Sequence, residues 1–236
     1  IYGNDLVKTP HLDKLASRGV LFTRAYSESP VCSPSRSALI TGSHAIRLGT
    51  HDHRSSRTKE NQIFLPENFK TAPEVFRENG YETYNSGKDD YNFFYKKSDL
   101  YSIMDSKIEN KLAKYGKSGQ GSGDWSDIKS QKPFFGQVRV SGGKDVGDQL
   151  PDLLAKSGYP VVKASQVTVP PQYPDIYEMR YNIAMHMNSI MQTDIEIGKI
   201  LSRLERDGLT DKTIVFVFSD HGSDLPRSKE FCYSEG

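Results

Sequence analysis

The sequence is poor in cysteine and carries no excess charge of either sign. Its 236 residues include two cysteines, and 31 Lys and Arg residues nearly balance 30 Asp and Glu residues. Two cysteines, Cys32 and Cys232, are able to pair but say little about the redox compartment. Balanced charge gives no bulk field that points to nucleic acid or to a membrane surface. The sequence also contains no apolar run long enough to span a bilayer.

The remaining composition is typical of a globular protein. Hydrophobic residues make up 36% of the chain and charged residues 26%. A chain of this length forms one large or two small domains and buries a substantial core. It begins at Ile1 with neither an initiator methionine nor a signal peptide, and this opening resembles the interior of a longer protein. We therefore interpret the chain as a fragment.

Helical and strand patterns alternate along the chain, which predicts an α/β fold with a mostly parallel sheet. We expect a helix that starts at Thr9, a second over 71–79, and a long one whose apolar positions run from Ile183 to Leu204. Strands are expected over 20–26, 81–85, 133–140 and 213–218. The last is continuously apolar, as in strands covered on both faces. Residues 95–132 lose this periodicity and are interpreted as a loop-rich insertion.

One short stretch around the first cysteine is the most informative. Ser33 is a favourable N-cap residue and Pro34 suits the first position of a helix. Cys32 then lies just ahead of a helix N-terminus, where unpaired N–H groups and the helix dipole favour negative charge. Arg36 follows about one turn later, so its guanidinium can reach back to the same place. A nucleophile, an anion-attracting helix end and a cation therefore converge.

An isolated cysteine near an arginine is more often a small buried side chain beside a solvated one. Here, however, seven positions within eleven residues fit one pattern: Cys32, Pro34, Ser35, Arg36, Leu39, Thr41 and Gly42. The stretch resembles the type I sulfatase signature, Cys-x-Pro-Ser-Arg followed by small-Leu-x-Thr-Gly. The resemblance covers nearly the whole chain and implies an alkaline-phosphatase-like fold with helices on both faces of a mostly parallel sheet. Residues 1–236 would then be a catalytic-domain fragment that lacks the first strand and the C-terminal subdomain.

The resemblance also implies a chemistry for the signature. In this family a maturase oxidises the cysteine, here Cys32, to formylglycine, whose hydrate attacks the sulfur of a sulfate ester. Arg36 would steady the hydrate, while Lys88 and Lys229 would hold the sulfate. A sulfate ester is anionic and repels nucleophiles, so a site that cleaves it needs cations around the sulfate oxygens.

The metal ligands are also implied by the resemblance. Asp220 and His221 follow the apolar run at 213–218, and an aspartate at a strand end often caps only the next helix. Beside the Cys32 signature, the two resemble the sulfatase Asp-Asn or Asp-His pair that binds a divalent cation together with residue 32. Calcium is the usual ion in this family and takes oxygen ligands. The paired aspartates of the sulfatase first strand do not occur in this chain.

Several residues depart from the family pattern or add to it. Asp90 stands where sulfatases often carry a histidine, and Lys144 stands near the position of the histidine that protonates the leaving oxygen. We expect Lys144 to serve as a sulfate ligand or acid. His51, His53 and Arg54 form a dense polar patch, and we interpret them, with Asp90, as substrate-contacting residues, because clustered histidines are more often surface or substrate contacts than metal ligands.

The leading hypothesis is a sulfuric-ester hydrolase that acts on a sulfated carbohydrate. The sugar preference follows from family frequency and from the polar insertion with its aromatic residues Tyr101, Tyr115 and Trp125. One alternative is a phosphomonoester or phosphonate hydrolase, although such relatives usually place Thr or Ser at the nucleophile. Another is an inactive homologue that binds glycans, which the departures at Asp90 and Lys144 keep open. By analogy we expect a periplasmic or secreted protein with no nucleic-acid partner.

Overall fold

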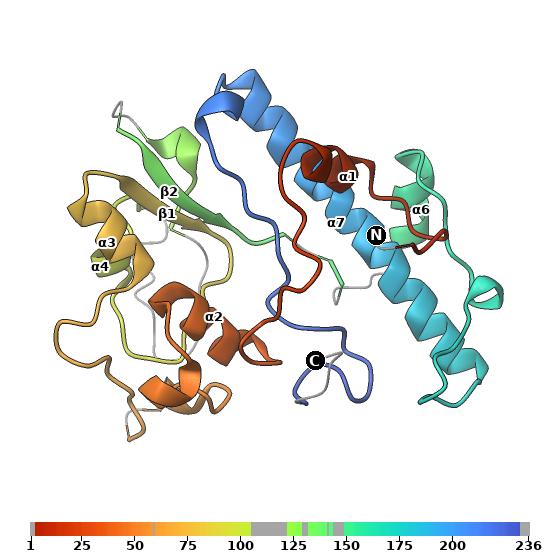
Figure 1. Cartoon of the computed structure of the whole chain (residues 1–236), viewed down its shortest axis with the longest axis horizontal. Helices are drawn as coiled ribbons and strands as arrows, with labels where there is room; N and C mark the ends of the chain where they lie inside the picture. Colours follow the sequence, from red (N-terminus) through yellow and green to blue (C-terminus); the bar gives the residue numbers. More distant parts are fainter. Residues whose placement is uncertain are drawn as a thin grey trace. The chain divides into compact units, whose positions relative to one another are not determined.

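The chain folds into two compact units, which Figure 1 shows in the colours of the sequence. We call them the helical unit (Ile1–Ala25, Val140–Phe218 and Ser223–Leu225) and the sheet unit (Tyr26–Arg139, Ser219–Gly222 and Pro226–Gly236). The structure is a computed structural model that describes residues 3–58, 60–104, 122–128, 132–140, 142–143 and 149–231. Among these residues, every helix is too short or too polar to cross a bilayer.

The helical unit is built around one long helix. This helix, α7 (Tyr177–Arg206), confirms the predicted long helix, and α1 (Pro10–Ser17) and α6 (Leu150–Lys156) pack against it. The described residues of the unit also include the 3-10 turns η4 (Ala164–Gln166) and η5 (Thr210–Lys212). Because the apolar residues of α7 recur at helical spacing, they form one stripe that faces a shared core. That core consists of Val7, Leu150, Leu154, Val162, Val167, Ile183, Ala184, Met185, Met191 and Ile195.

A buried aspartate of α7 caps the start of α1. The side chain of Thr9, the N-cap residue, makes no capping hydrogen bond. Instead, Asp194 accepts hydrogen bonds from the backbone N–H groups of Leu12 (2.8 Å) and His11 (3.2 Å), and from the hydroxyl of Tyr159 (2.7 Å). The first N–H groups of a helix have no partner within the helix, so Asp194 both satisfies two of them and fixes α1 on α7.

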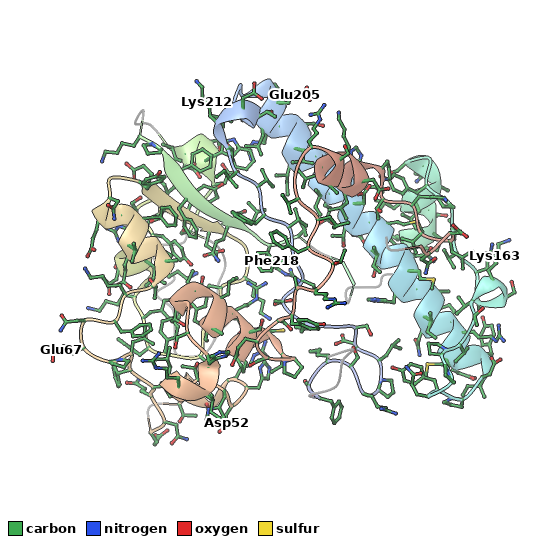
Figure 2. The ribbon with its side chains drawn as sticks, viewed as in Figure 1. Asp52, Glu67, Lys163, Glu205, Lys212 and Phe218 are labelled. Atoms are coloured by element: carbon green, nitrogen blue, oxygen red, sulfur yellow. The ribbon has the colours of Figure 1, made fainter. Side chains whose placement is uncertain are left out.

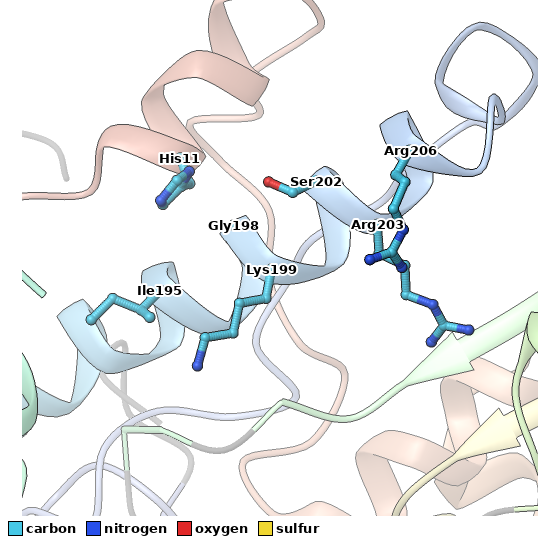
Figure 3. A pocket seen from close by; sticks show the side chains of 7 residues that line it. All are labelled: His11, Ile195, Gly198, Lys199, Ser202, Arg203 and Arg206. Carbon is cyan, nitrogen blue, oxygen red and sulfur yellow. The ribbon is translucent and has the colours of Figure 1, made fainter.

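A groove of about 430 Å³ lies between α1 and one face of α7 (Figure 3). It is lined by His11, Ile195, Gly198, Lys199, Ser202, Arg203 and Arg206. The His11 ring lies so close to Gly198 that a Cβ there would approach it to 2.5 Å. Glycine at this position therefore allows the two helices to pack, and the groove contains no residue that the sequence nominated for a site.

The described residues of the sheet unit form a parallel two-stranded sheet and three short helices. Strands β1 (Glu82–Ser86) and β2 (Phe134–Val138) pair in parallel, as predicted for 81–85 and 133–140. The helices are α2 (Cys32–Thr41), α3 (Ala72–Glu78) and α4 (Lys97–Leu100), and the 3-10 turns are η1 (Ala45–Leu48), η2 (Ser55–Arg57) and η3 (Trp125–Asp127). Parallel strands require a crossover connection. Both α4 and η3 lie between β1 and β2 in the sequence and belong to this connection.

Aromatic side chains hold the sheet unit together. Phe76 of α3 stacks on Phe135 of β2 with the ring centroids 4.5 Å apart. Tyr84 pairs with Gly136 across the ladder, and its ring occupies the space that a side chain at Gly136 would need. A separate core cluster beneath α2 consists of Ile40, Tyr91, Phe93, Leu100 and Tyr101.

Two predicted strands are wrong within the part of the chain that the structure describes. Residues 20–26 and 213–218 form no strand there. Their apolar side chains are largely exposed, including Val20 (77%), Ile214 (83%) and Phe218 (61%), the last of which is labelled in Figure 2. A continuous apolar strand is buried only where neighbouring strands and covering helices surround it. In the described residues neither segment has a ladder partner, so the apolar pattern alone does not produce a strand.

The insertion predicted over 95–132 contains core residues rather than loops alone. Tyr101 and Trp125 are buried, with 1% and 9% of their surfaces exposed, so neither presents its ring to a sugar. Tyr115 lies outside the described residues. In α3, Val75 is 45% exposed, while Phe76 packs against Phe135.

We expect Asp194→Ala to lower the free energy of unfolding by about 3 kcal/mol, because three donors lose a buried charged acceptor. Asp194→Asn should cost less, since its amide oxygen still accepts a hydrogen bond. Urea denaturation followed by circular dichroism measures both. The exposed Asp211→Ala is the matched control and should change the value by less than about 0.5 kcal/mol. Equal midpoints for Asp194→Ala and the control would contradict the capping role.

Candidate active site

The first cysteine is the first residue of a helix. Helix α2 begins at Cys32 with Val31 as the N-cap residue, so the predicted N-cap at Ser33 is wrong by two positions. Val31 is extended (φ −149°, ψ 150°), and its carbonyl already accepts a hydrogen bond from the Ser35 N–H at 3.1 Å. The helix ends at Thr41, and its C-cap residue Gly42, the predicted stop, has a positive φ of 62°. Cys32 is buried, with 4% of its surface exposed, and lies at the positive end of the helix dipole.

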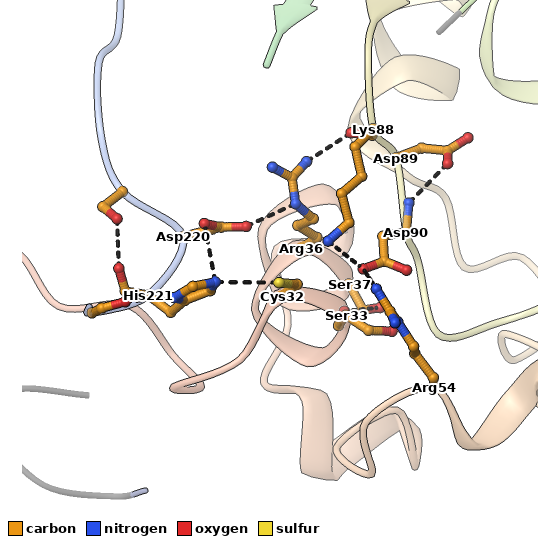
Figure 4. A network of polar contacts seen from close by, with 12 residues as sticks. Cys32, Ser33, Arg36, Ser37, Arg54, Lys88, Asp89, Asp90, Asp220 and His221 are labelled. Carbon is orange, nitrogen blue, oxygen red and sulfur yellow. Dashed lines mark hydrogen bonds and ion pairs between the residues drawn. The ribbon is translucent and has the colours of Figure 1, made fainter. Parts of the chain in front are cut away.

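A histidine from the far end of the chain contacts this thiol. His221 Nε2 lies 3.2 Å from Cys32 Sγ (Figure 4). The other ring nitrogen, Nδ1, lies 2.7 Å from the carbonyl oxygen of Gly222. A carbonyl can only accept, so Nδ1 carries a proton and donates it there. This contact fixes the ring and directs Nε2 at the sulfur.

Arg36 joins three separate stretches of the site. Its Nε donates to Asp220 Oδ2 at 2.8 Å, and its Nη1 donates to the carbonyl oxygen of Lys88 at 2.8 Å. The other oxygen of Asp220, Oδ1, lies 3.8 Å from His221 Nε2. Arg36 therefore connects the first turn of α2 both to the turn after β1 and to the segment that carries His221, as Figure 4 shows.

A buried carboxylate holds the second cation of the site. Lys88 Nζ lies 2.7 Å from Asp90 Oδ2, and Arg54 Nη2 lies 3.3 Å from the same oxygen. The Asp90 side chain has no exposed surface. The neighbouring Asp89 is also buried and pairs with Lys97 at 3.3 Å. Asp90 therefore contacts two cations of the protein itself, Arg54 and Lys88, and its ion pair with Lys88 fixes the position of the ammonium group.

These contacts shift the pKa values of the three central groups. Burial alone would raise the pKa of the Cys32 thiol, but the hydrogen bond with His221 and the charge of Lys88 outweigh it and lower the pKa to about 6. Burial lowers the pKa of Lys88, partly opposed by Cys32. For His221, burial lowers the pKa, but hydrogen bonds with Cys32 and with the Gly222 carbonyl raise it overall. The site therefore stabilises the thiolate form of Cys32.

The predicted polar patch lies on a loop that is tied to α2. His51 and His53 are exposed. The loop is fixed by Asn92, whose side-chain amide donates to the carbonyl of Asp52 (2.6 Å) and whose backbone N–H donates to Ser37 Oγ of α2 (2.7 Å). Sequence reasoning missed Asn92, because a buried asparagine that braces a loop belongs to no motif. It also missed Asp89, because a buried carboxylate that pairs with a lysine, here Lys97, belongs to no motif either.

Two further lysines, Lys229 and Lys144, were expected at the site, and the structure describes only Lys229. Lys229 is half-buried, and the N–H of the next residue, Glu230, donates to the carbonyl of Pro30 at 2.8 Å. The chain at Lys229 therefore runs beside the segment that leads into Cys32. Lys144 and Cys232 lie outside the described residues, so the role expected of Lys144 stays a prediction.

Among the residues that the structure describes, one cluster of three side chains could hold a metal ion. The ligand atoms of Cys32, Asp220 and His221 all lie within 4.8 Å of one another. Calcium takes six to eight oxygen ligands in proteins. This cluster offers one carboxylate, one imidazole nitrogen and one sulfur, so these three donors by themselves do not suit calcium.

Comparisons with known proteins identify relatives of the whole chain. The sulfatase family model matches residues 1–236. The chain is 28% identical, over 271 aligned residues, to an ulvan-active sulfatase of Formosa agariphila, an alignment that covers 100% of this chain and 43% of that protein. The chain thus spans less than half the length of that relative.

Two solved structures share the fold. A protein solved with its substrate D-glucosamine-2-N,6-O-disulfate matches with a TM-score of 0.57 at 16% identity, over 94% of this chain and 62% of its own. The phosphonate monoester hydrolase of Silicibacter pomeroyi also has a TM-score of 0.57, at 18% identity, over 92% of this chain and 58% of its own. The predicted alkaline-phosphatase-like fold is thereby confirmed. At such identities, likeness extends to the fold alone.

We expect the Cys32 thiol to react with iodoacetamide at a rate that rises with pH through a midpoint of about 6, because the thiolate is the nucleophile and its pKa is lowered to about 6. His221→Ala should move the midpoint upward, since the thiol stays buried while its main stabilising contact is lost. The rates are measured by mass spectrometry in a Cys232→Ser background. His44→Ala, which changes an exposed histidine, is the control. A wild-type midpoint near 9 would contradict this electrostatic environment.

Proposed function

The chain belongs to the sulfatase family, and we propose that it hydrolyses the sulfate ester of a sulfated saccharide. The observation that supports this most directly is the position of Cys32, buried at the N-terminus of α2 beside His221 and Lys88. The relative that acts on ulvan and the structural neighbour solved with a glucosamine disulfate support the saccharide.

We propose that a maturase converts Cys32 to formylglycine before the chain acts. The aldehyde supplies, in its hydrated form, an oxygen nucleophile at the place where the sulfur now lies. The same surroundings that favour a thiolate favour a developing alkoxide there, because the helix dipole and the charge of Lys88 stabilise any anion at that place.

The cations of the site are suited to hold the sulfate group. Lys88 lies within interaction distance of residue 32. Its ion pair with Asp90 fixes its position, and Arg54 pairs with the same carboxylate oxygen. Arg36 is held by Asp220 and by the Lys88 carbonyl, which orients its guanidinium along the first turn of α2. Charged hydrogen bonds to the oxygens of the transferring group strengthen as charge develops on them. We propose that Lys229 and Lys144 add to this set.

His221 is placed to move a proton at residue 32. Its Nε2 faces the reacting side chain and its Nδ1 is held by the Gly222 carbonyl. A side chain within hydrogen-bond distance of the reacting group is placed to give or take a proton there. We derive no step from calcium, because the three donors described here do not suit that ion. A periplasmic or secreted location stays a prediction from the family.

We expect protein coexpressed with a formylglycine-generating maturase to show, in the peptide that contains Cys32, the mass loss from thiol to aldehyde, and to release sulfate from a panel of sulfated saccharides. Cys32→Ala should abolish release. Lys88→Ala should lower kcat/KM by about 100-fold, as the loss of a donor to the developing charge does. Ion chromatography of free sulfate measures the rates.

Lys70→Ala is the matched control, because Lys70 pairs with Glu78 on the surface of the sheet unit and should leave the rate unchanged. Turnover retained in Cys32→Ala would refute the nucleophile. Phosphonate monoester cleavage without sulfate release would favour the hydrolase class that shares the fold. An unmodified thiol with no sulfate release would support the inactive glycan-binding homologue.

A further inference from the structure

The groove between α1 and α7 is a candidate binding site apart from the residues around Cys32. Its volume of about 430 Å³ falls in the range of pockets that hold small ligands. All the residues that line it belong to the helical unit, whereas Cys32 and His221 belong to the sheet unit. The groove therefore has to be explained by its own side chains.

The wall that α7 contributes carries a row of cations. Lys199, Arg203 and Arg206 follow one another at four- and three-residue spacing, which places them on one side of the helix. At about 1.5 Å of rise per residue, they recur about every 4.5–6 Å along the helix axis. Figure 3 shows the three side chains on α7 and His11 on α1. The row suits a ligand that carries several negative charges along its length.

The positive charge of this row is only partly neutralised. Asp207 Oδ2 lies 3.7 Å from Arg203 Nε, and Asp207 Oδ1 lies 3.5 Å from Arg206 Nε, so one carboxylate faces two guanidinium groups. Among the described residues, those that line the groove include no acidic side chain. Lys199 is exposed, and 73% of the Arg206 side chain is exposed. A ligand anion can therefore approach both cations from solvent.

The other lining residues suit a sugar better than a nucleotide. Ser202 offers a hydroxyl and His11 a ring nitrogen, and both groups hydrogen-bond to hydroxyls. Ile195 and Gly198 add apolar surface, against which the C–H groups of a sugar ring can pack. Single-stranded nucleic acids bind by stacking their bases on aromatic rings, and the imidazole of His11 is the only ring among the residues that line the groove.

We propose that this groove binds a sulfated saccharide chain, with its sulfate groups on Lys199, Arg203 and Arg206. The choice of a sulfated saccharide rests on the proposed function, because the groove and the hydrolase then meet the same polymer. Binding in the groove keeps the other sulfate groups of that polymer at a high effective concentration around the chain. The groove therefore lowers the KM for a polymer and leaves turnover of a sulfated monosaccharide unchanged.

Isothermal titration calorimetry with a heparin octasaccharide tests binding in the groove. The measurements use Cys32→Ala protein, so that the probe is not hydrolysed. We expect Lys199→Gln/Arg206→Gln to weaken binding about 10-fold, as the loss of two exposed ionic contacts implies, and to make its salt dependence shallower. Ser202→Trp fills the groove but keeps its charges, and it should weaken binding to a similar extent.

Lys156→Gln/Lys163→Gln is the matched control, because it removes the same charge from two exposed lysines of the same unit. This variant should bind the octasaccharide as the Cys32→Ala protein does, and a desulfated octasaccharide should not bind. The proposal is overturned if the groove variants bind no more weakly than the control, if Ser202→Trp has no effect, or if a single-stranded oligonucleotide of equal charge binds the groove as tightly.

Turnover by maturase-treated protein with Cys32 intact separates this proposal from the hydrolase. Lys199→Gln/Arg206→Gln should raise the KM for a sulfated polymer about 10-fold and leave kcat/KM for a sulfated monosaccharide unchanged. An unchanged KM for the polymer would also overturn the role of the groove. Sulfate release without octasaccharide binding in the groove leaves the hydrolase proposal standing, whereas binding without sulfate release refutes the hydrolase and not the groove.

Discussion

The ion pair between Arg36 and Asp220 joins two stretches of chain that are 184 residues apart, and the candidate site depends on it. Both side chains are mostly buried, with 19% and 24% exposed, so the pair is screened less than a surface pair. Because His221 directly follows Asp220, the pair also determines where the imidazole lies. The 3.2 Å contact between His221 Nε2 and Cys32 Sγ therefore depends on the ion pair that the preceding residue, Asp220, makes with Arg36.

A second set of ion pairs, centred on Asp90, places a lysine beside Cys32. Arg54 and Lys88 share the buried carboxylate of Asp90, which fixes a cation beside Cys32 without exposing the carboxylate itself. The anion-stabilising environment therefore has three sources: the N-terminus of α2, the held lysine and the held histidine. These three sources stabilise a negative charge at residue 32, whether a sulfur or an oxygen atom carries it.

The sequence predicted the parts whose causes are local. Helix α7 follows from its apolar spacing, and the signature around Cys32 indicated the helix and the family. The run at 213–218 was misjudged, because an apolar pattern forms a strand only beside another strand, and no sequence pattern shows its neighbours. Asp90 was assigned to substrate for a related reason: a sequence position does not reveal that a carboxylate is fully buried between two protein cations.

The most direct test is a thiolate absorbance titration of Asp220→Ala in a Cys232→Ser background. Removing a negative charge near a thiol lowers its pKa if charge alone matters. If the Arg36–Asp220 pair holds His221 against the sulfur, its loss frees the histidine, and the pKa of Cys32 rises from about 6 toward its ordinary value. A rise is the predicted result, and an unchanged or lower pKa would contradict the account.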